Sequence, residues 1–320
     1  MKYRKLGRSD IVVSEIGYGC WPIGGGWGAT DDAGDIRSLH EAKEAGITFF
    51  DTAMVYASGR SESLLGKAFK DSRKDIIIAD KIGPKTSLNG PADGVYPYDW
   101  VIECTEASLK RLGTDYIDVQ QIHQWRNRFT EEDGWYDAMQ KLKADGKIRS
   151  FGISTESWEP TGAVPITASG RIGVVQDIYN VFDQEPTNST LFPAAAETNT
   201  GVIARVPLFE GLLSGKIEAG YEWNQGDWRK DFFTNDRLAI AAPHIDAIKD
   251  IAQGANLSPA ELCLKFCLSH RVISTVIVGM RNPKHVSTNC AVSDLSDLSD
   301  ETLKALHDQS WLHGWLYPWS

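Results

Sequence analysis

The chain has 320 residues, of which 42% are hydrophobic and 24% charged, and its formal net charge is −10. This composition is typical of a folded globular protein, and the acidic balance argues against binding to nucleic acid, whose phosphates attract basic surfaces. The first ten residues lack the apolar core of a signal peptide, and no run of about eighteen apolar residues predicts a membrane span.

The five cysteines are scattered along the chain. Such usage indicates reduced thiols, so we expect a cytoplasmic protein. Cys263 and Cys267 are four residues apart and could share a helix face, but no second pair or histidine follows at zinc spacing. We therefore expect these two residues in the core and no metal site.

Short apolar segments alternate with helical ones from the N-terminus onward. Strands are predicted at 12–19, 47–51, 75–81, 116–123, 148–154, 173–180, 201–208 and 274–279. Helices are predicted at 35–46, 61–70, 105–113, 134–146, 192–199 and 257–269. Strands that are apolar on both faces and alternate with helices indicate a parallel sheet. About eight such units in roughly 300 residues favour one closed (β/α)8 TIM barrel over residues 1–320.

Residues 2–17 contain two short runs about a Gly/Ser/Asp turn. We expect this segment to form a β-hairpin across one end of the barrel.

Polar side chains stand at the predicted carboxyl ends of the strands or on the loops after them. They are Asp51, Tyr56, Lys81, His123, Ser154, Gln176 and Arg205. Because catalytic groups of such barrels lie at this end, these positions predict the active site.

The first four of these residues suit a general-acid site. A tyrosine has a reference pKa of about 10, and a nearby ammonium lowers that pKa by favouring phenolate. Lys81 could supply the ammonium, Asp51 could hold Lys81 in place, and His123 could orient a substrate oxygen. Each residue taken singly has a structural explanation, and it is their combination that favours catalysis.

The sequence "DTAMVYASGRSESLLGKAF" resembles the aldo-keto reductase signature DTA-x-x-Y-G-x-S-E-x-x-L-G-x-A. The resemblance extends over nearly the whole chain and includes "SLKRLGTDYIDVQQIH", "PLFEGLLSGK" and "VIVGMRNPKHVSTN". It implies a barrel that reduces aldehydes and ketones with a nicotinamide cofactor, and a catalytic tetrad of Asp51, Tyr56, Lys81 and His123. It also implies a substrate pocket lined by loops and by a C-terminal tail over the active-site mouth.

The resemblance further implies a set of cofactor-binding residues. They are Cys20, Trp21, Asp51, Ser154, Gln176, Arg205, Pro207, Leu208, Gly211, Ser214, Lys216, Gly279, Met280, Arg281, His285 and Asn289. No G-x-G-x-x-G fingerprint is present, because Pro22 stands where its third glycine would fall. Arg281, Lys284 and His285 cluster in one segment, which favours NADPH over NADH or, alternatively, is only a solvated basic loop.

Four positions depart from the family pattern. Ala57 replaces the usual glycine after the tetrad tyrosine, and Asp80 precedes Lys81 where relatives often have threonine. Alternation along the strand predicts that Asp80 points away from the lumen. Thr288 stands where many relatives have a glutamate that binds adenine. Arg205 stands where many have a tyrosine that stacks on the nicotinamide, so we expect its planar guanidinium to hold the cofactor or an oxygen-rich substrate, or else to point outward.

The C-terminal segment carries Trp311, Trp315 and Trp319 at intervals of four, with His313 and Tyr317 between them. This pattern indicates packing of the tail or, alternatively, a pocket wall shared with Trp21, Trp27, Trp125, Arg126 and Asn127.

Such a wall favours a sugar-like or other polar aldehyde as the small-molecule substrate. The alternatives are a sugar dehydrogenase acting mainly in the oxidative direction and an auxiliary ion-channel subunit. The sequence does not fix the oligomeric state.

Overall fold

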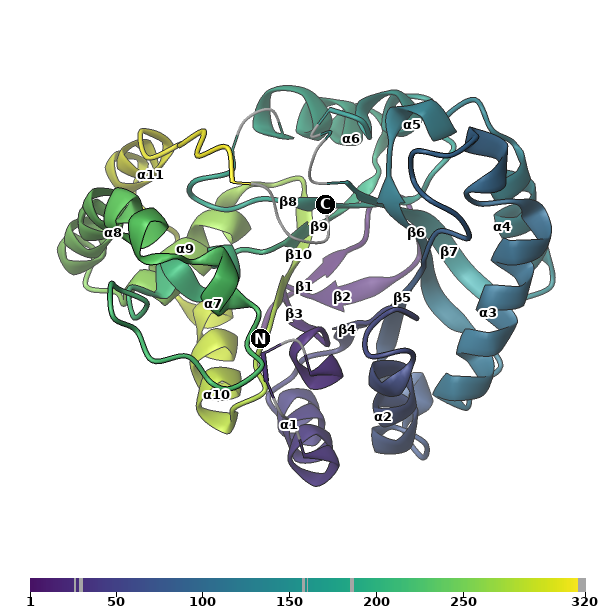
Figure 1. Ribbon diagram of the computed structural model, residues 1–320, viewed down its shortest axis with the longest axis horizontal. Helices are drawn as coiled ribbons and strands as arrows, with labels where there is room; N and C mark the ends of the chain where they lie inside the picture. Colours follow the sequence, from purple (N-terminus) through teal and green to yellow (C-terminus); the bar gives the residue numbers. More distant parts are fainter. Residues whose placement is uncertain (26, 29–30, 157–158, 160, 185–186, 316–320) are drawn as a thin grey trace.

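The computed structural model describes residues 1–25, 27–28, 31–156, 159, 161–184 and 187–315 (Figure 1). Eight parallel strands close into a barrel in the order β10-β3-β4-β5-β6-β7-β8-β9. Their bounds are β3 Ile16–Gly19, β4 Phe49–Asp51, β5 Ile77–Ile82, β6 Ile117–Trp125, β7 Ile148–Thr155, β8 Val174–Ile178, β9 Gly201–Arg205 and β10 Ile273–Val278. The predicted (β/α)8 barrel is therefore confirmed.

Helices surround the barrel on its outside (Figure 1). Those of the repeating units are α1 Asp32–Glu44, α2 Arg60–Ala68, α3 Tyr98–Leu112, α4 Gly134–Ala144, α5 Val164–Ala168, α6 Phe192–Thr198, α9 Pro259–Ser269 and α10 Pro283–Ala291. Further helices are α7 Arg229–Phe232, α8 Asn235–Gly254 and α11 Asp300–His307. The sequence did not predict α5, α7, α8, α10 or α11.

The N-terminal hairpin closes one end of the barrel, as expected. Strand β1 (Tyr3–Lys5) pairs antiparallel with β2 (Val12–Ser14). Around them Leu6, Ile11 and Val13 pack with residues that point into the barrel from six strands, namely Phe49, Ala79, Val119, Val174, Ile203 and Ile277. A Cβ atom at Gly201 would lie 2.8 Å from the carbonyl carbon of Leu6, so this close contact requires glycine. With this end sealed, ligands can reach the lumen from the carboxyl ends of the strands.

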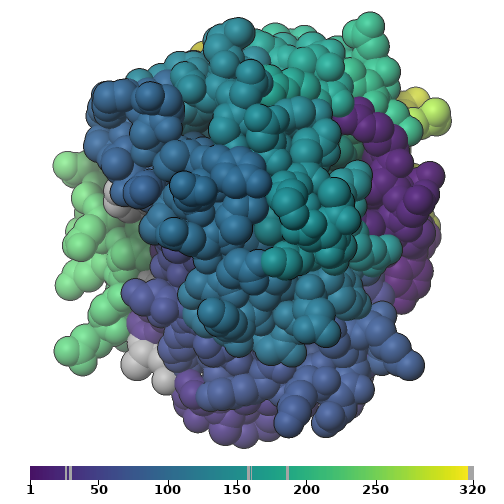
Figure 2. Space-filling model, turned by 90° about the vertical axis from the view of Figure 1, so that its right-hand side faces the viewer, coloured from purple at the N-terminus to yellow at the C-terminus, as the bar shows by residue number. Residues whose placement is uncertain are grey.

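The side of the molecule built from α3 and α4 is a continuous layer of packed side chains (Figure 2). In this view the purple N-terminal segment lies at the right edge, and green residues from the region of α7 and α8 lie at the left edge. The hairpin and the long connection after β9 therefore occupy opposite sides of this face.

All five cysteines are buried, and Cys263 and Cys267 of α9 belong to the main hydrophobic core, as predicted. Of the helices that the structure describes, none has the length and apolarity needed to cross a membrane.

Candidate active site

Three of the predicted catalytic side chains enter the lumen because side chains alternate along a strand. In β5, Ala79 belongs to the barrel interior, so Lys81 points the same way. By the same alternation, Asp51 faces the same side of β4 as the interior residue Phe49, and His123 faces the same side of β6 as the interior residue Val119. Tyr56 reaches the same place from the loop between β4 and α2.

Lys81 joins the two residues predicted to act with it. Its Nζ atom lies 2.5 Å from Oδ2 of Asp51 and 3.2 Å from the hydroxyl oxygen of Tyr56. A third bond goes to the backbone carbonyl of Thr52 at 3.1 Å. Lys81 and Asp51 are almost fully buried, whereas Tyr56 lies at the cavity surface. Donors and acceptors around the ammonium are therefore matched, and its charge is neutralised by one carboxylate.

The two titrating groups respond differently to this environment. Burial alone would lower the pKa of Lys81, but the charge of Asp51 and the contacts with Asp51 and Tyr56 together outweigh burial, so the pKa is raised and the amine stays protonated. Burial raises the pKa of Tyr56, and Lys81 acts in the opposite direction without cancelling that effect. The expected lowering by Lys81 is therefore present, but the net shift is upward because desolvation of the phenolate is the larger effect.

An irregularity bends β6 directly after His123. The pairing of β6 with β7 shifts register between Ile122 and Trp125, and Gln124 has a φ of 61°. The hydroxyl of Tyr96 donates to the carbonyl oxygen of His123 and fixes this bend. Burial, followed by the charges of Lys81 and Arg205, lowers the pKa of His123 well below its usual value. The imidazole is therefore neutral, and its buried Nδ1 has no partner in the described structure.

A polar network continues from Asp51 across the lumen. Nε2 of Gln176 donates to Oδ1 of Asp51 at 2.7 Å and lies 3.4 Å from Oε1 of Gln121. The hydroxyl of Ser154 lies 3.4 Å from Oε1 of Gln176. The sequence analysis missed Gln121, although the alternation that places His123 in the lumen also places Gln121 there.

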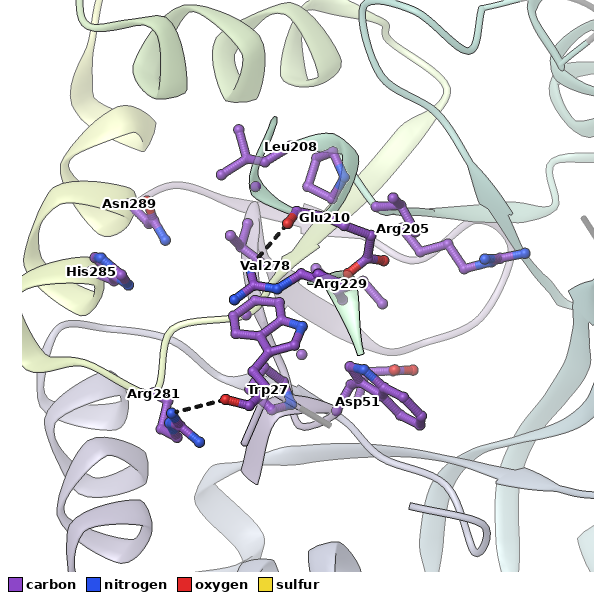
Figure 3. Close-up of a pocket in the computed structure, with 18 of the residues that line it drawn as sticks. Trp27, Asp51, Arg205, Leu208, Glu210, Arg229, Val278, Arg281, His285 and Asn289 are labelled. Atoms are coloured by element: carbon purple, nitrogen blue, oxygen red, sulfur yellow. Dashed lines mark hydrogen bonds between the residues drawn. The ribbon is translucent and has the colours of Figure 1, made fainter. Parts of the chain in front are cut away.

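A cavity of about 970 Å³ opens above these residues. Most of the predicted site lines it: Trp21, Asp51, Tyr56, His123, Ser154, Gln176, Arg205, Pro207, Leu208, Gly211, Ser214, Lys216, Gly279, Arg281, His285 and Asn289. Arg281, His285 and Asn289 lie at one end and Asp51 and Arg205 at the other (Figure 3). The structure thus brings together residues from both halves of the chain.

Cys20 and Met280 do not line this cavity. Both side chains are fully buried in the main core. The thiol of Cys20 is directed at the backbone carbonyl of Tyr18, at 3.9 Å. Their neighbours Trp21 and Arg281 face the cavity instead.

The end of the cavity beside α10 carries positive charge. Arg281 and Lys216 line this end of the cavity. Lys284, which the sequence analysis grouped with Arg281 and His285, does not line it. Burial, followed by the charge of Lys216, lowers the pKa of His285. At this end a neutral imidazole therefore accompanies the two cations. Thr288 also lines this end.

The middle of the cavity is crossed by a clasp of four residues, of which the sequence singled out only Trp27; the others are Glu210, Asp227 and Arg229. Trp27 forms an isolated β-bridge with Asp227, and the Arg229 guanidinium lies 4.4 Å from the Trp27 ring. Arg229 also pairs with Asp227 at 2.7 Å and donates to the carbonyl oxygen of Glu210 at 3.1 Å. The Glu210 side chain faces Arg229 in Figure 3. This clasp joins the loop after β3 to the loop after β9, which are remote in sequence.

The described part of the C-terminal tail packs beside the cavity. Trp311 and His313 contact the loop after β8 through the backbone of Phe182 and the carboxylate of Asp183. The ring of Trp315 lies tilted against that of Phe209, with 6.1 Å between the ring centroids. No tail residue up to Trp315 lines the cavity, and residues 311–315 are not helical. Trp319 and Tyr317 lie outside the described residues.

Packing of the tail, the first of the two interpretations of the tryptophan spacing, is therefore confirmed for Trp311 and Trp315, and the alternative of a pocket wall is wrong for them. The pocket wall is also wrong for Trp125, which is fully buried against Phe129 and Trp135. Arg126 and Asn127 do not line the cavity, whereas Trp21 and Trp27 do.

Two further departures from the family pattern, Asp80 and Ala57, lie outside the barrel lumen and on the loop after Tyr56, respectively. Asp80 points out of the lumen, as predicted, toward Gln120 at 3.3 Å. Ala57 and Ser58 have φ values of 49° and 51°, so the loop after Tyr56 passes through the left-handed region without glycine at these two residues.

Comparison with known proteins shows the family of this chain. The family model described as "Aldo/keto reductase family" matches residues 15–309. An uncharacterized oxidoreductase, YqkF of Bacillus subtilis, is 31% identical over 97% of this chain and 97% of its own length. The aldo-keto reductase yakc [NADP(+)] of Schizosaccharomyces pombe is 28% identical over 95% of this chain and 90% of its own length. A probable voltage-gated potassium channel subunit beta of rice is 29% identical over 93% of each chain.

Solved structures of two bacterial proteins are also similar. The aldo-keto reductase AKR11C1 of Bacillus halodurans, in its holo form, has a TM-score of 0.79 and 29% identity over 99% of this chain and 98% of its own. The glycerol dehydrogenase AKR11B4 of Gluconobacter oxydans has a TM-score of 0.80 and 26% identity over 96% of this chain and 94% of its own.

Proposed function

Because the chain belongs to the aldo/keto reductase family and is an oxidoreductase, we propose that it reduces an aldehyde or ketone to the alcohol with NADPH. The observation that carries the proposal is the contact of one buried ammonium, that of Lys81, with both Asp51 and the Tyr56 hydroxyl at the cavity floor. This arrangement suits protonation of an oxygen that arrives in the cavity.

We assign the following roles to the chain's residues. The Tyr56 hydroxyl donates its proton to the carbonyl oxygen as that oxygen gains negative charge. The Lys81 ammonium stabilises the phenolate that remains, and Asp51 keeps Lys81 charged and in place. The neutral imidazole of His123 orients the same oxygen through a hydrogen bond. A reduced nicotinamide, when bound, supplies the hydride that the carbonyl carbon accepts.

The residues that line the cavity support a dinucleotide with an extra phosphate, such as NADPH, as the cofactor. Ser154 and Gln176 offer a hydroxyl and an amide at the tetrad end, where a carboxamide could bind. The backbone at Val206, Phe209 and Glu210 adopts positive φ values, which lets the loop after β9 follow the cavity. Arg281 and Lys216 lie at the far end, and their positive charge suits a phosphate on the adenosine ribose.

The cofactor proposal is tested by tryptophan fluorescence of the purified protein, titrated separately with NADPH and NADH. We expect NADPH to bind more tightly. Arg281→Ala should weaken NADPH binding by about tenfold or more, with a smaller effect on NADH, because it removes a charge-assisted contact to the phosphate. Lys284→Ala is the matched control, since Lys284 lies outside the cavity. Equal binding of both cofactors, or equal effects of the two substitutions, would refute the preference.

A second candidate is oxidation of a sugar or other polyol, because the similar structure AKR11B4 is a glycerol dehydrogenase. Tighter binding of NADH and alcohol oxidation faster than aldehyde reduction would favour it. The channel-subunit alternative draws on the similarity to the rice protein, and a stable complex with a membrane channel would favour it. A cytoplasmic location stays a prediction of the cysteine usage.

A further inference from the structure

The substrate end of the cavity contains a guanidinium with unused binding capacity. Arg205 ends β9, and the alternation that places Ile203 in the barrel interior directs Arg205 to the same side. It lines the cavity together with Tyr56 and His123. Its Nη2 atom donates to the backbone carbonyl of Thr155 at 3.0 Å, which fixes the orientation of the group. Its buried Nε has no partner in the described structure.

Arg205 also lacks a counter-ion. None of the carboxylates that the structure describes lies within 4.0 Å of its guanidinium. Its charge acts in the lowering direction on the pKa of two carboxyls, those of Asp177 and Glu210, but neither forms an ion pair with it. The oxygens of Asp177 are occupied by the hydroxyls of Thr155 and Thr187 and by the amide of Ile178. In contrast, Lys81 is paired with Asp51. Arg205 is partly buried, so its guanidinium has lost part of its hydration, and an anionic ligand would replace the lost interactions.

The charge of Arg205 reaches the reacting groups. After burial and Lys81, it is a further cause of the lowered pKa of His123, and it acts in the lowering direction on Tyr56. The cofactor does not account for this cation, because the phosphates of a dinucleotide would lie toward Arg281 and Lys216. Arg205 lies at the other end of the cavity, on the side of Asp51 (Figure 3).

Resting on the proposed function, we propose that the preferred substrates are carbonyl compounds that also carry a carboxylate, which Arg205 binds while the carbonyl oxygen contacts Tyr56 and His123. A guanidinium presents parallel N–H donors that match the two oxygens of a carboxylate. A polyhydroxylated neutral aldehyde would satisfy the Nε donor but would leave the charge uncompensated. Among polar carbonyl compounds, we therefore expect the anionic ones to be the preferred substrates.

The test compares para-carboxybenzaldehyde with methyl para-formylbenzoate, which present the same aldehyde with and without a negative charge. With NADPH saturating, we expect wild-type kcat/KM to favour the acid by about tenfold or more. Arg205→Gln should abolish this preference, and Arg205→Lys should keep part of it. Arg126→Gln is the matched control: Arg126 is a nearby arginine outside the cavity and paired with Glu156 at 3.8 Å, so its loss should leave the ratio unchanged.

Each other outcome has a defined meaning. Equal or faster turnover of the ester by the wild-type protein would overturn the inference and leave the reductase proposal intact. An unchanged acid-to-ester ratio in Arg205→Gln, together with weaker NADPH binding, would also overturn it and assign Arg205 to the cofactor. Turnover of neither aldehyde would refute the proposed function itself. If Arg205→Gln does not fold, inhibition of ester reduction by benzoate but not by benzamide supports the inference, and equal inhibition overturns it.

Discussion

The Nε2 atom of Gln176 lies 2.7 Å from Oδ1 of Asp51, the carboxylate oxygen that Lys81 does not contact. Asp51 is therefore held from two sides, by an ammonium from β5 and by an amide from β8. Because both contacts are buried, they determine where the Asp51 carboxylate and, through it, the Lys81 ammonium lie. Gln176 thus connects the proposed carboxamide site with the proposed proton donor.

Substitution of Gln176 by Met should impair both functions. Methionine has a similar length but no donor, so Oδ1 of Asp51 loses its amide partner in a buried site. We expect kcat to fall by about tenfold and cofactor affinity to fall by a similar factor, since a hydrogen bond to a charged group contributes about 1.5–3 kcal/mol. Steady-state kinetics and cofactor titration measure the two effects. Ser154→Ala removes the hydroxyl of the proposed carboxamide site and a 3.4 Å contact to Gln176, but keeps the contact of Gln176 with Asp51, so it should affect cofactor affinity more than kcat.

Substitution of Tyr56 by Phe should remove the proton donor and leave cofactor binding intact. We expect reduction to slow by about 10²–10⁴-fold, the usual contribution of a general acid. At saturating cofactor the wild-type rate should be flat from about pH 6 to about pH 9, because the raised pKa of Tyr56 keeps it protonated and His123 stays neutral. A pH–rate profile with an inflection near about 6.5 would instead identify His123 as the acid.

Much of this site follows from the sequence because its geometry is local. Asp51, Lys81 and His123 each end a predicted strand, and alternation alone decides that they face the lumen while Asp80 does not. A closed barrel then brings neighbouring strand ends together. The resemblance to the family covered the same residues independently.

The clasp and the tail could not be read from the sequence, because both depend on contacts between remote loops. Trp27 meets Asp227 and Arg229 across about 200 positions of the chain, and no spacing indicates such a contact. The helix α8 was missed although it is long, since Pro243 lies in its interior and interrupts the helical signal. The tryptophan spacing at the C-terminus left tail packing and a pocket wall open, and the contact of Trp311 with the backbone of Phe182 decides for packing.

Glu210 should make cofactor binding depend on pH. Burial raises the pKa of its carboxyl to about 7, and the charges of Arg229 and Arg205 oppose this shift without cancelling it. Below this pKa the group is neutral, and above it a negative charge lies in the cavity where phosphates are expected. NADPH affinity should therefore fall several-fold as the pH rises from about 6 to about 8. Fluorescence titration across this range measures the effect.

Glu210→Gln should make that affinity independent of pH in the same range, because the amide cannot deprotonate. Asp231→Asn on α7 is the control, since Asp231 is exposed, close to Arg229 in sequence and outside the cavity. An unchanged pH dependence in Glu210→Gln would assign the titration to another group.

Asp80 lies on the outward side of β5, and its ionisation should affect the stability of the protein. Its carboxyl is fully buried, and burial, followed by the charge of Glu62, raises its pKa to about 7. Nε2 of Gln120 donates to Oδ2 of Asp80, while Oδ1 of Asp80 and Oε1 of Gln120 are both buried acceptors without partners in the described structure. A proton on Asp80 would let the acid and the amide satisfy each other.

Asp80→Asn should therefore stabilise the protein at about pH 8 and have little effect at about pH 5. The folded-state pKa lies above the unfolded value of about 3.9, so the folded state binds the proton more tightly and wild-type stability falls as the pH rises from about 4 to about 7. Asparagine supplies the missing donor at every pH. We expect a gain on the order of 1–3 kcal/mol at the higher pH, measured by denaturant unfolding at both values. A loss of stability at about pH 8 would mean that Asp80 is ionised in the folded protein and that its charge contributes to the fold.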